Sequence, residues 1–138
     1  KIQVAQRGKN MNPGILSHEL GHAKQNPKSL LTKGSALGRY AQLSYLPLIL
    51  TGDEDTAKLV AGAGSAMAVP QFMHEMDASV KGRKLLLDAA KKSGNKLGFM
   101  RSLGSFKGLP TYALAVAAPY MMYKYLKSQD QYKKSKEN

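Results

Sequence analysis

Three stretches of the chain carry no charged residue, and they limit the folds open to it. They cover residues 40–52, 59–73 and 108–123, which are 13, 15 and 16 residues long. A helix that spans a bilayer needs about 20 predominantly apolar residues, so all three fall short of that length. We expect buried helices of a helical domain. The alternative is short or re-entrant membrane helices that pack through the small residues of Ala61–Ala68.

Prolines, glycines and caps divide the chain into segments. Asn12-Pro13-Gly14 predicts a helix start, with an Asn cap and Pro in the first helical position. This helix should end before Pro27. A second helix is expected over residues 33–50, with a bend or break near Pro47. The acidic residues at 53–55 predict the start of a third helix, which carries 59–73 and passes with a kink at Pro70 into a fourth stretch over 71–93. A last helix is expected over 110–131, with loops at 93–95 and 104–110. Residues 1–5 alternate in polarity and are a short strand candidate.

Size and composition exclude several classes of protein. The chain has 138 residues, which is the length of one domain, and we expect that domain over residues 1–123 with a basic tail at 124–138. The sequence has no cysteine, so disulfide frameworks and cysteine-based zinc sites are excluded. The formal net charge is +12, but residues 40–80 hold one lysine and five acidic residues. Because a nucleic-acid-coating protein should not keep an acidic middle, we do not expect nucleic acid as the main partner.

One motif carries chemistry: His18-Glu19-Leu20-Gly21-His22. Residues four apart share a helix face, so His18 and His22 can both bind one Zn²⁺. Glu19 would lie beside the water that the zinc activates and serve as its general base. The alternative interpretation is two surface histidines on an amphipathic helix. The sequence therefore favours a zinc hydrolase site at this helix.

A catalytic zinc usually has three protein ligands, so a third is needed. His74, Glu75 and Asp77 interrupt an apolar stretch, which is costly unless these side chains are paired or bind a metal. A solvated acidic helix end is the alternative. For the developing oxyanion we predict Tyr112 as the hydrogen-bond donor, although a tyrosine that only packs between helices fits the same position.

Three segments together resemble the neutral zinc metallopeptidases of the YugP-like group, which are membrane-associated bacterial enzymes. His-Glu-Leu-Gly-His-Ala-Lys-Gln at 18–25 is similar to their His-Glu-Val-Gly-His-Ala-Ile-Gln motif. Residues 69–79 resemble their Leu-Pro-Val-Glu-Phe-Asp-Ala-Ser signature, and residues 109–115 resemble their Leu-Thr-Tyr-Val-Ala-Ala stretch. The resemblance implies that Glu75 is the third zinc ligand and that Asp77 supports the ligands. His74, an extra potential ligand beside Glu75, departs from the family pattern.

These observations predict a mainly α, compact zincin-like domain, with a short strand element before the helix that bears the zinc motif. The expected activity is zinc-dependent hydrolysis of peptide bonds in a peptide or protein substrate. The alternatives are a structural or latent zinc site in a larger membrane or virion assembly, and a basic protein that binds nucleic acid or anionic lipid. We expect the protein at an anionic membrane surface or in a larger particle, with a soluble cytoplasmic form as the alternative.

Overall fold

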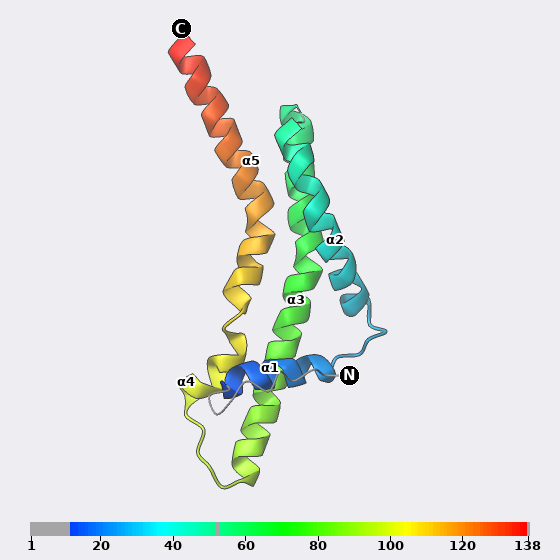
Figure 1. Ribbon diagram of the computed structural model, residues 1–138, viewed down its shortest axis with the longest axis vertical. Helices are drawn as coiled ribbons and strands as arrows, with labels where there is room; N and C mark the ends of the chain where they lie inside the picture. The colour runs from blue at the N-terminus through cyan, green and yellow to red at the C-terminus, as the bar shows by residue number, and fades with distance from the viewer. Residues whose placement is uncertain (1–11, 52, 138) are drawn as a thin grey trace.

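The computed structural model describes residues 12–51 and 53–137, and over these residues the chain is helical with no strand (Figure 1). The mainly α class predicted from the sequence is therefore confirmed. The strand candidate at residues 1–5 lies outside the described residues.

Five α-helices and one 3₁₀ helix follow one another along the described chain. They are α1 (Pro13–Ala23), α2 (Leu30–Thr51), α3 (Glu54–Lys92), α4 (Phe99–Ser102), the 3₁₀ helix η1 (Leu103–Phe106) and α5 (Leu109–Glu137). The helices α2, α3 and α5 run along the long axis of the molecule, and α1 lies across α3 (Figure 1). Because α1, α2, α5 and η1 all contact α3, this helix is the scaffold on which the other elements are placed.

Local chemistry explains where these helices begin and end. Asn12 caps α1 as predicted, since its side-chain oxygen accepts from Gly14 N at 2.9 Å. Asp53 caps α3 by accepting from Thr56 N at 2.8 Å, and an acidic first turn favours that helix end. The chain leaves α3 at Gly94, whose φ of 71° suits a residue without a side chain.

Two boundary predictions were wrong. We expected a third helix that passes at Pro70 into a fourth stretch, but α3 is one helix of 39 residues that includes this proline. The ring of Pro70 faces Gly34 of α2, so packing against neighbouring helices offsets the backbone hydrogen bond that proline cannot make. The loop expected at 104–110 is also shorter, because η1 covers most of its first half and α5 begins at Leu109.

An apolar core joins α3 to α2 and α5 in the half of α3 that precedes Pro70. Ile49, Ala57, Ala61 and Tyr123 are its buried members. Small residues on α3 allow the neighbouring helices to approach closely. Among the helices that the structure describes, none combines the length and the hydropathy that crossing a membrane requires.

In the other half of α3, α1 packs directly on the backbone. Gly21 of α1 lies against the Ala78 carbonyl, and Gly82 of α3 lies against the Ser17 carbonyl. A Cβ on either glycine would overlap the opposing carbonyl oxygen. Both glycines are therefore required for the distance between these helices, and this distance decides which side chains of α1 and α3 can meet.

This packing predicts opposite effects for two glycine substitutions in the same helix. Gly82→Ala should destabilise the fold by about 1–3 kcal/mol, because the new methyl group overpacks the α1–α3 contact. Gly62→Ala is the matched control, since nothing lies within 4 Å of its Cβ position. This control should stabilise the fold by about 0.5–1 kcal/mol through helix propensity. Urea unfolding followed by circular dichroism measures both changes, and equal effects at the two positions would contradict the packing described here.

Candidate metal centre

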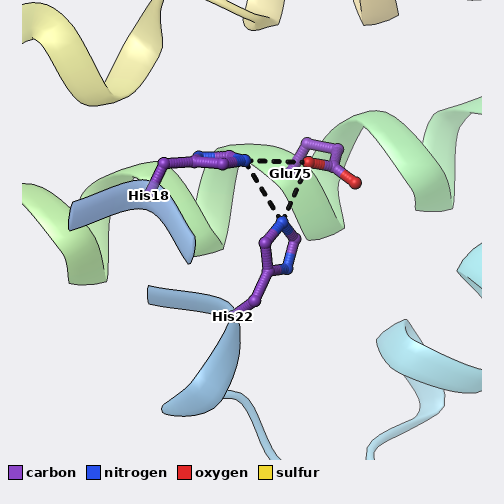
Figure 2. Close-up of side chains that lie close together, drawn as sticks. All are labelled: His18, His22 and Glu75. Carbon is purple, nitrogen blue, oxygen red and sulfur yellow. Dashed lines mark hydrogen bonds and ion pairs between the residues drawn. The ribbon is translucent and has the colours of Figure 1, made fainter. Parts of the chain in front are cut away.

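His18 and His22 lie on the face of α1 that meets α3, one helical turn apart (Figure 2). Their Nε2 atoms are 3.2 Å from each other. The side chains are 19% and 26% exposed, so one side of the pair remains open to solvent. As their spacing predicted, the two histidines share one face of α1, and their imidazole rings meet at one point.

Glu75 of α3 completes the group. Its Oε2 lies 3.2 Å from His18 Nε2 and 3.1 Å from His22 Nε2, and its side chain is only 3% exposed. Figure 2 shows the carboxylate of α3 pointing at the two rings of α1. One ligand atom from each of the three residues lies within 4.8 Å of the other two, so the group could hold a metal ion.

Ser79 sets the orientation of His18. The Ser79 hydroxyl donates its one proton to the Glu75 carbonyl oxygen at 2.9 Å, one turn back along α3. The Ser79 oxygen, 3.0 Å from His18 Nδ1, must then accept a hydrogen bond from Nδ1–H. The Nε2 atom is the side of the ring that faces Glu75, and in the neutral form of the ring it carries the lone pair.

The three atoms that meet at this point have the chemistry of a cation site. A carboxylate oxygen and imidazole lone pairs repel one another in a partly buried environment unless a proton or a metal ion lies among them. Two imidazoles and one carboxylate are ligands that suit Zn²⁺. The residues present therefore fit a zinc ion by the nature of their donor atoms.

The pKa shifts of His22 and Glu75 also favour charged groups at this point. The hydrogen bond with Glu75 raises the pKa of His22 above its ordinary value of 6.5, against an opposing effect of burial. Burial by itself would raise the pKa of Glu75. The hydrogen bond from His22 and the nearby charges of His22 and His18 outweigh burial and hold that pKa below 4.5. His22 and Glu75 thus each favour the charged form of the other.

A second layer of polar groups surrounds His22. Gln25 Oε1 lies 2.8 Å from His22 Nδ1, and Gln25 Nε2 donates to the His74 carbonyl at 2.6 Å and to Asp77 Oδ2 at 3.1 Å. Lys81 donates to the same Asp77 oxygen at 2.7 Å. Asp77, expected to support the ligands, therefore reaches His22 through Gln25.

The structure brings three of the residues predicted for the site together and places the others around them. His18, His22 and Glu75 form the cluster, whereas His74 is buried with its ring centroid 5.3 Å from that of His22. Glu19 is exposed on α1, and its charge contributes to the raised pKa of His22. Tyr112 is half-buried in the first turn of α5. The catalytic roles of Glu19 and Tyr112 stay predictions.

Gln25 and Ser79 were not predicted from the sequence as residues of the site. Both lie inside the motifs that suggested the site, three residues after His22 and four residues after Glu75. Ser79 shares a helix face with Glu75, but Gln25 lies beyond the end of α1, and both side chains reach their partners on the other helix only where α1 crosses α3.

Comparison of the chain with protein-family models, with curated proteins and with solved structures found no match.

The pair of His22 and Glu75 predicts how the stability of metal-free protein depends on pH. A raised histidine pKa contributes stability below pH 6.5 that is lost as pH rises through the raised value. A lowered carboxyl pKa contributes stability above pH 4.5 that is lost as pH falls through the lowered value. Glu75→Gln should therefore cost most between these limits, about 2 kcal/mol for a hydrogen bond to a charged group, and less at higher pH.

Chemical unfolding in a chelating buffer across this pH range measures the effect. Glu54→Gln is the matched control, because its partner Lys127 stays charged throughout and the pair is at the surface. A cost of Glu75→Gln that stays constant into the alkaline range would contradict the pairing with His22.

Proposed function

We propose that this chain is a zinc-dependent peptidase in which His18, His22 and Glu75 hold Zn²⁺ and Glu19 is the general base. The observation that carries the proposal is the meeting of two imidazole Nε2 atoms and one buried carboxylate oxygen within 3.2 Å. These atoms come from two helices that are far apart in the sequence and touch through their backbones.

The donor set favours a catalytic site over a structural one. Structural zinc sites are closed by four protein ligands, whereas catalytic sites have three and leave a position open. The cluster offers three, and both histidines are partly exposed, so solvent reaches one side of the cluster. Glu75 is favoured over His74 as the third ligand, because its carboxylate contacts both imidazoles.

A zinc ion bound there would supply Lewis acidity, which activates water and polarises a scissile carbonyl. The chain supplies the proton transfer. Glu19 follows His18 directly on α1 and is exposed to solvent, so its carboxylate is free to accept the proton of an attacking water and to return it to the leaving amine. Tyr112 is our candidate donor to the oxyanion, and the substrate class is a peptide or a protein.

The proposal predicts that metal binding and catalysis separate in two glutamate variants. Glu19→Gln should keep its zinc and lose cleavage by about 10²–10⁴-fold, because it removes only the proton transfer. Glu75→Gln should lose zinc and cleavage together. Metal analysis of the purified proteins and a mixed-peptide cleavage assay measure both quantities, with Glu54→Gln as the exposed control that changes neither.

Other results of these measurements would change the proposal. Zinc in the wild type without cleavage would indicate a structural or latent site. Undiminished zinc in Glu75→Gln would remove Glu75 from the ligand set, and absence of zinc from the wild type would overturn the proposal. Unchanged cleavage by Tyr112→Phe would remove Tyr112 from the mechanism.

A further inference from the structure

Gln25 forms hydrogen bonds with residues of both helices at the site, with His22 of α1 and with His74 and Asp77 of α3. It lies two residues after the end of α1, next to Lys24, the C-terminal cap of that helix. Its amide oxygen faces His22 Nδ1, and its amide nitrogen donates to the His74 carbonyl and to Asp77. The Gln25 side chain therefore connects the Nδ1 side of His22 to α3.

The partners of Gln25 fix which way its amide points. A carbonyl oxygen accepts hydrogen bonds and never donates, and the same holds for the carboxylate of Asp77, which is ionised and paired with Lys81. The group that faces both must be the amide NH₂. Rotating the amide by 180° would place its oxygen against two acceptors, so this arrangement is excluded.

The orientation of the amide in turn fixes the histidine. With the NH₂ group toward α3, the Gln25 oxygen faces His22 Nδ1 at 2.8 Å and can only accept a hydrogen bond. His22 Nδ1 must therefore carry a hydrogen, whether Nε2 carries a proton or binds a metal. Only the Nε2 position, 3.1 Å from Glu75, changes its occupant.

We propose that Gln25 is a positioning residue that holds His22 in the Nδ1–H form and presents its Nε2 lone pair to the metal. The inference rests on the proposed function and deepens it. Ser79 of α3 holds the Nδ1 atom of His18 in a similar way. His22, however, lies in the last turn of α1 and is the more exposed of the two histidines. Its orientation depends on a residue outside the helix.

Removing Gln25 should weaken zinc binding without unfolding the protein. Partners of metal-binding histidines typically contribute about 10–100-fold in metal affinity, so Gln25→Leu should weaken zinc binding by that factor. Gln129→Leu is the matched control, because Gln129 is exposed on α5 and the same change there should leave affinity unchanged. Competition with a chromophoric chelator measures affinity, and circular dichroism verifies that each variant is folded.

A charge rearrangement distinguishes positioning from general support of the fold. In Gln25→Glu the new carboxylate still accepts from His22, but it faces the Asp77 carboxylate and the His74 carbonyl, so zinc affinity should fall. Adding Asp77→Asn gives the second oxygen of that carboxylate a donor and keeps the net charge of the wild type. The double variant should recover part of the lost affinity, because the His74 carbonyl still faces the carboxylate. If Gln25 only supports the fold, this specific rescue is not expected.

Nitrogen NMR of the zinc-loaded protein reads the histidine directly. We expect a hydrogen-bonded Nδ1–H signal from His22 in the wild type and in the double variant, and its loss in Gln25→Leu. Equal zinc affinity of wild type and Gln25→Leu would overturn this inference and leave the zinc site standing. A wild type that binds no zinc would overturn both.

Discussion

The site depends on one backbone contact, the crossing of α1 over α3 at Gly21 and Gly82. At this crossing, side chains that are more than fifty residues apart in sequence reach one another, and a single methyl group at either glycine would overlap a backbone carbonyl. His18 and His22 can meet Glu75 only because the two helices approach so closely. The packing of small residues, rather than the length of any side chain, is what assembles the ligand set.

The same crossing buries a carboxylate against two imidazoles, which is unfavourable unless a proton or a metal ion lies among them. Glu75 is nearly inaccessible to solvent, and burial alone opposes its ionisation. The hydrogen bond and the charges of the two imidazoles compensate for this burial. The hydrogen bonds of Ser79 and Gln25 hold the Nδ1 sides of both rings, so the Nε2 sides face Glu75, where our proposal places Zn²⁺. Ser79 and Gln25 thus have the same role, which is to orient the two histidine rings.

Sequence patterns predicted the parts of this structure that depend on short spacing. The helical class, the Asn12 cap and the shared face of His18 and His22 follow from local rules. The continuity of α3 through Pro70 could not be predicted, because it depends on neighbouring helices that a proline rule ignores. Glu75 was identified through the resemblance, while the residues alone left His74 and Asp77 open. The partners Gln25 and Ser79 depend on the crossing of α1 and α3, which no local pattern reveals.

The most direct test is a zinc-edge anomalous difference map from crystals of the wild-type protein grown with zinc. We expect one dominant peak, about 2.0–2.2 Å from His18 Nε2, His22 Nε2 and a Glu75 oxygen. We also expect Gln25 to accept from His22 Nδ1 in these crystals. A zinc peak bound by His74 in place of Glu75, or no peak between α1 and α3, would show that His18, His22 and Glu75 are not the zinc site.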